Sequence, residues 1–103
     1  MYLAKVVGVV VATKKDPAME GRKLLVLRPV VADDKSPSSL KELDMTFIAV
    51  DSVGAGEGEL VLFCQGSSAR LAPGLKQAPV DAVIIGIVDT VDVLGKKVYT
   101  TKK

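Results

Sequence analysis

Aliphatic, strand-forming runs are the feature that most constrains the fold of this chain. The sequence has 17 Val, 11 Leu and 4 Ile among 103 residues, against 2 Phe, 2 Tyr and no Trp. Val and Ile lose side-chain freedom in helices and pack well on pleated strands. No apolar run is longer than seven residues, whereas a membrane-spanning helix needs about 20. We therefore expect a mostly β protein of one domain, residues 1–103, without a transmembrane span or a signal peptide.

Five runs are expected to form strands, and turn-forming residues end each of them. The first, residues 2–13, is apolar almost throughout, as in a strand covered on both faces. Gly8 lies inside it and predicts a bend. The fifth run, residues 82–94, is as long, and Gly95-Lys96 is expected to form a hairpin turn that leads from it into a last strand at 97–100. The other expected strands are residues 23–31, 46–51 and 60–64.

The segments between these runs are expected to be turns and loops. Residues 32–45 are polar and are expected to form a mobile loop, in which 38–43 could make a helical turn. Turns are also predicted at 16–22 and at 79–81, since Pro suits the first position of a helical turn. Closing the sheet into a barrel removes exposed strand edges. The pattern predicts an all-β fold, a small five-stranded OB-like β-barrel with one or two short helical turns and a C-terminal hairpin; a β-sandwich is the second interpretation.

The aliphatic content is high for a small soluble monomer, with a mean hydropathy of +0.34. A domain of this size buries only about two-thirds of the surface that its unfolded chain exposes. The excess of apolar side chains therefore predicts a second burial event, of which self-association is the simplest form.

The residues needed for common enzyme chemistry are scarce. The chain has no His, which removes the most frequent general base and transition-metal ligand. Ser67 and Ser68 thus have no His to activate them, and we interpret them as helix caps. A net charge of +2 is too balanced to indicate a polyanion partner. The single Cys64 cannot form an internal disulfide, which fits a reducing compartment. We expect no catalytic residue, no metal site and no cofactor.

A glycine-rich loop, residues 54–58, first suggests phosphate binding. Phosphate-binding loops open a helix, whereas this one follows a strand and leads into another strand. We interpret it as a tight connection between strands, with Glu59 within reach of an amide or an Arg. Asp81, Asp89 and Asp92 do not have the spacing of a calcium loop and are interpreted as solvated or ion-paired.

Nucleic-acid binding is considered because OB-type barrels often bind single strands. Such sites combine aromatic stacking platforms with a basic groove. The aromatic residues here are Tyr2, Phe47, Phe63 and Tyr99, and the two Phe lie inside strand patterns. The Lys pairs lie beside turns or at the terminus without interleaved aromatics. We expect no nucleic-acid and no membrane partner, and a monomeric OB-type module that binds a ligand or nucleic acid is the alternative function.

Five sequence blocks follow one another over nearly the whole chain. They are AKVVGVVVATKKDP (4–17), GRKLLVL (21–27), AVDSVGAGEGE (49–59), GSSAR (66–70) and PVDAVIIGIVD (79–89). In this order they strongly resemble the bacterial microcompartment vertex family, the CcmL/EutN-type pentameric shell proteins. Residues 32–45 are longer than is usual in that family. The blocks GEGE and GSSAR resemble the catabolic metabolosome branch more than the carboxysome branch.

The resemblance implies a structural shell protein without enzymatic activity. Members of the family are OB-like barrels that form cyclic homopentamers in the bacterial cytoplasm. They occupy the five-fold vertices of a microcompartment shell whose other tiles are hexameric shell proteins. A flat hexagonal sheet cannot close, so five-fold units are needed to curve it. A cyclic ring closes through a head-to-tail interface.

The resemblance also implies which residues meet at the pentamer interface. The loop Gly54, Ala55 and Gly56 is expected near the five-fold axis, where small residues allow five copies to approach. We expect Arg70 to form charge-assisted hydrogen bonds across the subunit boundary, with Glu59 or Asp81 as the alternative partners. The expected interface residues are Gly54, Ala55, Gly56, Gly58, Glu59, Ser67, Ser68 and Arg70, with Pro79 and Asp81 in a structural turn.

Overall fold

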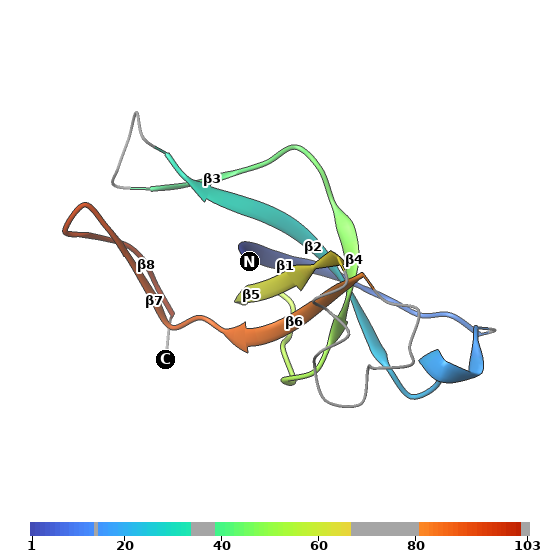
Figure 1. The fold of residues 1–103 in the computed structure, drawn as a ribbon. Coiled ribbons are helices and arrows are strands. Elements are labelled where there is room, and N and C mark those ends of the chain that lie inside the picture. Colours follow the sequence, from blue (N-terminus) through green and yellow to red (C-terminus); the bar gives the residue numbers. More distant parts are fainter. Residues whose placement is uncertain (14, 34–38, 67–80, 102–103) are drawn as a thin grey trace.

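Five strands close into a β-barrel in the computed structural model, which describes residues 1–13, 15–33, 39–66 and 81–101 (Figure 1). The order around the barrel is β1-β2-β4-β6-β5 and back to β1. All neighbouring strands are antiparallel except β4 and β6, which are parallel. The expected all-β, OB-like barrel is thereby confirmed. The barrel strands are β1 (Tyr2–Val10), β2 (Lys23–Ala32), β4 (Phe47–Asp51), β5 (Leu60–Gln65) and β6 (Ala82–Ile87).

The barrel core is aliphatic around one aromatic ring. Phe63 is buried and contacts Phe47, with ring centroids 4.7 Å apart, and Tyr2, at 5.5 Å. The fully buried large side chains come from four barrel strands. They are Phe63, Leu25, Leu27, Ile84, Val6, Val61 and Val83. All of them except Val83 belong to the barrel core; Val83 packs with Val50 in a second, smaller cluster.

The predicted bend at Gly8 is confirmed as a bulge in β1. The register with β2 shifts between Val6 and Gly8, so that Val7 is the extra residue. A Cβ atom on Gly8 would lie 3.5 Å from Val26 Cγ2. The bulge turns the distal half of β1 away from the first half, as bulges do in small barrels.

The first polar turn is confirmed as well. A single 3-10 turn, η1 (Pro17–Met19), lies between β1 and β2. Asp16 caps it, because its Oδ1 accepts a hydrogen bond of 2.9 Å from the backbone N of Ala18. Pro17 occupies the first helical position, where its missing N–H costs nothing.

Three expected segments differ from the structure. Residues 39–43, the described part of the expected helical turn, do not form one, because Leu40–Glu42 form β3, which pairs with the far end of β2. The expected strand 82–94 is broken at Val88 and Asp89. β5 begins at Leu60, so β6 has no partner to pair with beyond that point. The first strand also ends at Val10 rather than at residue 13.

The C-terminal hairpin is confirmed, although its turn is Leu94-Gly95 instead of Gly95-Lys96, because Val93 pairs with Lys96. It consists of β7 (Thr90–Val93) and β8 (Lys96–Thr100), which form a separate two-stranded sheet. Figure 1 shows it, in orange and red, projecting from one end of the barrel. The molecule is elongated as a result, with extents of 45 × 27 × 23 Å.

Candidate functional site

The glycine loop, residues 52–59, connects β4 to β5 and contains two residues that need glycine for conformation. Gly54 has φ +82° and Gly58 has φ +86°, a region that side chains with a Cβ atom disfavour. Gly56 is different. Its φ is not positive, and a Cβ atom there would meet only Glu59 Oε1, at 3.5 Å. The conformation of the single chain therefore explains why residues 54 and 58 are glycine, but it does not explain why Gly56 is.

Buried Asp51 holds the start of the glycine loop. Its Oδ1 accepts hydrogen bonds from the backbone N of Val53, at 3.0 Å, and of Gly54, at 3.1 Å. Lys23 Nζ donates to the backbone O of Ala55, at 2.6 Å, and lies 3.7 Å from Asp51 Oδ2. The Asp51 side chain is only 1% exposed. Charge-assisted hydrogen bonds thus tie three consecutive loop residues to the ends of two strands.

Glu59 holds the end of the same loop. Its Oε1 accepts a hydrogen bond of 2.6 Å from the backbone N of Gly56, in agreement with the expectation that Glu59 reaches an amide. The backbone of Gly58 donates to Val6 O, at 2.8 Å, and Val6 N donates to Glu59 O, at 3.0 Å. Ala55, between the two anchors, is fully buried. The loop is consequently fixed within one chain.

Sequence reasoning missed Asp51 and Lys23. An Asp directly before Ser-x-Gly is a signal for an Asx-type turn, in which the carboxylate accepts bonds from backbone N–H groups two and three residues on. That signal is readable in the sequence. Lys23 is brought to the loop by the pairing of its own position with Asp51 across β2 and β4, which local spacing does not reveal.

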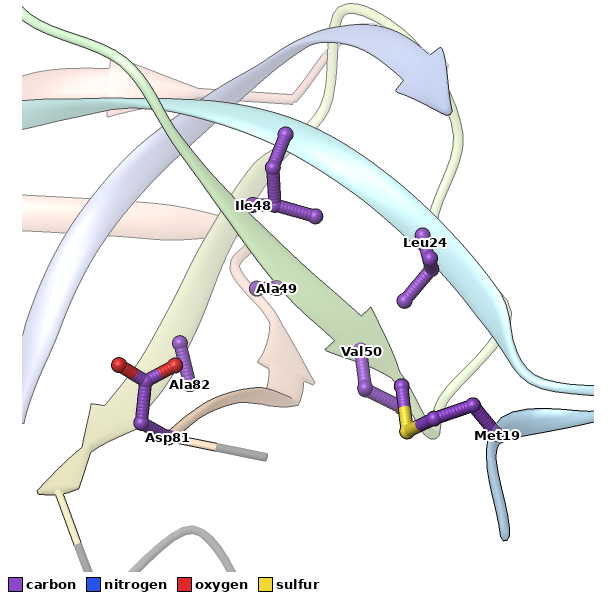
Figure 2. Close-up of a pocket in the computed structure, with 7 residues that line it drawn as sticks. All are labelled: Met19, Leu24, Ile48, Ala49, Val50, Asp81 and Ala82. Carbon is purple, nitrogen blue, oxygen red and sulfur yellow. The ribbon is translucent and has the colours of Figure 1, made fainter. Parts of the chain in front are cut away.

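Four of the predicted interface and turn residues, namely Ser67, Ser68, Arg70 and Pro79, lie outside the described residues. Asp81 is described and lies in a bend directly before β6, with its backbone O accepting from Gly66 N at 2.7 Å. The Asp81 carboxylate is exposed and sits at the rim of a shallow pocket (Figure 2).

That pocket has a volume of about 190 Å³ and mostly apolar walls. Pockets that take small-molecule ligands are commonly about 300–1,000 Å³. Asp81 supplies the charged group, and the other walls are aliphatic or Met. The lining residues are Met19, Leu24, Ile48, Ala49, Val50, Asp81 and Ala82. Its size and walls do not favour a cofactor site.

Aliphatic side chains are exposed along two barrel strands. In β1 and the residue that follows it, Val7, Val9 and Val11 point outward, and Val11 is 90% exposed. β5 pairs only with Tyr2–Lys5 of β1, so among the described residues the distal half of β1 has one strand edge without a partner strand. Ile85 and Ile87 are exposed on β6. Such rows are typical of surfaces that a protein partner covers.

Clusters of metal-binding side chains are absent from the described part of the chain. Residues 1–13, 15–33, 39–66 and 81–101 contain no group of His, Cys, Asp or Glu that could hold a metal ion. Within the same ranges no helix is long and apolar enough to cross a membrane. What the described surface offers is a rigid glycine loop and exposed aliphatic rows.

Comparison with known proteins explains this combination. The family described as ethanolamine utilisation protein EutN/carboxysome matches residues 1–89. The chain belongs to the EutN/CcmL family. It is 50% identical over 90 residues to PduN, a bacterial microcompartment shell vertex protein of Salmonella typhimurium, covering 87% of this chain and 97% of PduN. It is 42% identical over 102 residues to CcmL, a carboxysome shell vertex protein of Gloeobacter violaceus, covering 99% of this chain and 96% of CcmL.

Solved structures in the EutN/CcmL family have the same fold. The structure of Gloeobacter violaceus CcmL superimposes with a TM-score of 0.87 and covers all of both chains. GrpN, a pentameric microcompartment shell protein from Rhodospirillum rubrum, superimposes with a TM-score of 0.78 at 41% identity, covering 91% of this chain and 100% of GrpN. These relatives are structural shell proteins, and the resemblance inferred from the five sequence blocks is thereby confirmed.

Proposed function

We propose that this chain forms a cyclic homopentamer that caps the five-fold vertices of a bacterial microcompartment shell in the cytoplasm, among hexameric shell proteins. The observation that carries the proposal is the full-length similarity to shell vertex proteins, one of which is a pentamer. The exposed aliphatic rows on β1 and β6 give the assembly a physical basis, because they need cover that one barrel does not provide.

The glycine loop is the proposed lining of the five-fold axis. Its anchors, Asp51 and Glu59, fix the loop before assembly, so no ordering entropy is lost when five copies meet. Neither its φ nor a close contact within one chain requires residue 56 to be glycine, which supports a requirement between chains. The proposed interface comprises Gly54, Ala55, Gly56, Gly58 and Glu59, joined by Ser67, Ser68 and Arg70, and Pro79 and Asp81 are the proposed structural turn.

Solution mass tests the proposal directly. The purified chain is expected at about five times 10.8 kDa by native mass spectrometry and by light scattering. Co-expression with hexameric shell proteins is expected to convert open sheets or tubes into closed particles. A chain that stays monomeric at micromolar concentration would contradict the pentamer.

A further inference from the structure

One peptide group of the glycine loop is bonded on both of its polar sides. The peptide that joins Ala55 to Gly56 consists of the carbonyl of Ala55 and the N–H of Gly56. The carbonyl oxygen accepts a hydrogen bond of 2.6 Å from Lys23 Nζ. The N–H donates a hydrogen bond of 2.6 Å to Glu59 Oε1. An ammonium and a carboxylate therefore hold opposite ends of the same peptide group.

The two charges favour the same orientation of this peptide. The carbonyl oxygen is the negative end of the peptide dipole and faces the Lys23 ammonium, whereas the N–H is the positive end and faces the Glu59 carboxylate. Hydrogen bonds to ionised groups are stronger than those between neutral groups. A reversed peptide would turn its oxygen toward Glu59 and its N–H toward Lys23, so both bonds would be lost and both charges would oppose that orientation.

The residue after this peptide makes such a reversal sterically possible. Type I and type II turns differ in the orientation of their central peptide, and the type II form needs a positive φ at the next residue, which glycine adopts readily. Gly56 is the next residue here, and its φ is not positive. Asp51 Oδ1 binds the backbone N of Val53 and Gly54, which precede this peptide. The orientation of the Ala55–Gly56 peptide therefore depends on Lys23 and Glu59.

We propose that Lys23 and Glu59 are positioning residues for assembly, which clamp the Ala55–Gly56 peptide in the one orientation in which five glycine loops close around the axis. The inference rests on the proposed function, which places the loop at that axis. In a cyclic ring every displacement of the loop is repeated in each subunit. Reversal of the peptide moves the carbonyl oxygen of Ala55 and changes the φ of Gly56, so it alters every contact at the axis at once.

The variant Lys23→Met removes the clamp at the oxygen side of the peptide. Met has an unbranched side chain that fills similar space but donates no hydrogen bond. The pentamer of this variant is expected to dissociate at an about tenfold higher concentration than the wild type, in a dilution series followed by mass photometry. Lys23→Arg retains the charge and the donors and is expected to dissociate less readily than Lys23→Met.

The readout specific to the clamp is hydrogen exchange at the Gly56 amide, measured by NMR. Lys23 binds the oxygen side of the peptide, whereas the exchanging hydrogen lies on the Glu59 side. In Lys23→Met the Gly56 amide is expected to exchange about tenfold faster than in the wild type, because the peptide is then free to turn away from Glu59. The amides of Val53 and Gly54, which bond to a different carboxylate, are expected to change less.

Variants of Glu59 test the other side of the peptide. Glu59→Gln retains an acceptor oxygen without the charge, whereas Glu59→Ala removes both. Glu59→Gln is therefore expected to dissociate less readily than Glu59→Ala. Lys41→Met, which removes an exposed lysine of β3, is the matched control and is expected to behave like the wild type. Urea denaturation of each dissociated chain measures the stability of the fold separately.

The outcomes distinguish this inference from the proposed function. Faster Gly56 exchange together with easier dissociation of a folded Lys23→Met chain supports the clamp. Unchanged dissociation of the Lys23→Met and Glu59→Ala pentamers overturns the clamp alone, as does easier dissociation without faster Gly56 exchange. If Lys23→Met does not fold, the two Glu59 variants decide: equal dissociation of Glu59→Ala and the wild type overturns the clamp. A monomeric wild type overturns the proposed function and the clamp together.

Discussion

The glycine loop and the C-terminal hairpin represent opposite ways of building a surface for assembly. The loop is tied to the barrel by two buried or half-buried carboxylates, Asp51 and Glu59, and by Lys23. The hairpin shares no sheet with the barrel and carries no buried residue. The conformation of the loop is thus held by contacts within one chain, whereas the hairpin has few such contacts to hold it.

The largest expected effect comes from Gly56→Val in the glycine loop. The single chain has room for a Cβ atom at residue 56, which would meet only Glu59 Oε1, at 3.5 Å. We expect loss of the pentamer, with the free energy of unfolding of the chain changed by no more than about 1 kcal/mol. Native mass spectrometry and urea denaturation measure the two quantities.

Gly54→Val is the matched control for that substitution. Gly54 has φ +82°, so a side chain strains the backbone whatever the assembly, and the chain itself is expected to lose about 1–2 kcal/mol. If Gly56→Val lowers the stability of the dissociated chain as much as Gly54→Val does, Gly56 is needed for the fold, and the contrast between the two glycines fails.

The second largest effect is expected for Asp51→Ala, on the free energy of unfolding of the chain. The substitution leaves two backbone N–H groups and Lys23 Nζ without their carboxylate, and such a loss costs about 2–3 kcal/mol of unfolding free energy. Asp44→Ala is the matched control, because the Asp44 side chain is fully exposed and its removal is expected to cost less than about 0.5 kcal/mol. Equal urea midpoints for the two variants would show that the glycine loop is not held as described.

The smallest effect concerns the dynamics of the two regions. In the dissociated chain, hydrogen exchange is expected to be fast at the amides of β7 and β8, with opening free energies near zero, and slow in β2 and β5. In the pentamer the hairpin amides are expected to slow down. The hairpin amides of the dissociated chain could instead be protected as strongly as those of the barrel. In that case the hairpin is as stable as the barrel, and the contrast with the anchored glycine loop fails.

Strand content and barrel closure were predictable because they depend on local patterns of Val, Leu and turn residues. The break at Val88 was not, because it is set by where β5 begins on the other side of the pairing. β3 was missed for a related reason, since Leu40–Glu42 become a strand by pairing with the overhanging end of β2. Both errors come from partners distant in sequence, which local propensity does not register.

The site residues also fall into two groups: those that local sequence predicted and those that depend on distant pairing. The reach of Glu59 to an amide was predicted from the sequence, whereas the sequence did not distinguish Gly54 and Gly58, which have positive φ, from Gly56, which does not. The Lys23 contact to Ala55 joins residues 32 positions apart, and the register of β2 and β4 creates it. The positive φ of Leu94, +51°, was not predicted either, because the sequence placed the turn one residue later, at Gly95-Lys96.

The joint at the base of the hairpin has a mechanical consequence. Two backbone hydrogen bonds, Val88 N to Leu60 O at 2.9 Å and Thr101 N to Asp89 O at 2.8 Å, meet where the hairpin leaves the barrel. Apart from them the hairpin shares no sheet with the barrel, so we expect its angle to the barrel to change more easily than the conformation of the anchored glycine loop. Differences in tilt between the subunits of the proposed pentamer would then be taken up at Val88 and Asp89.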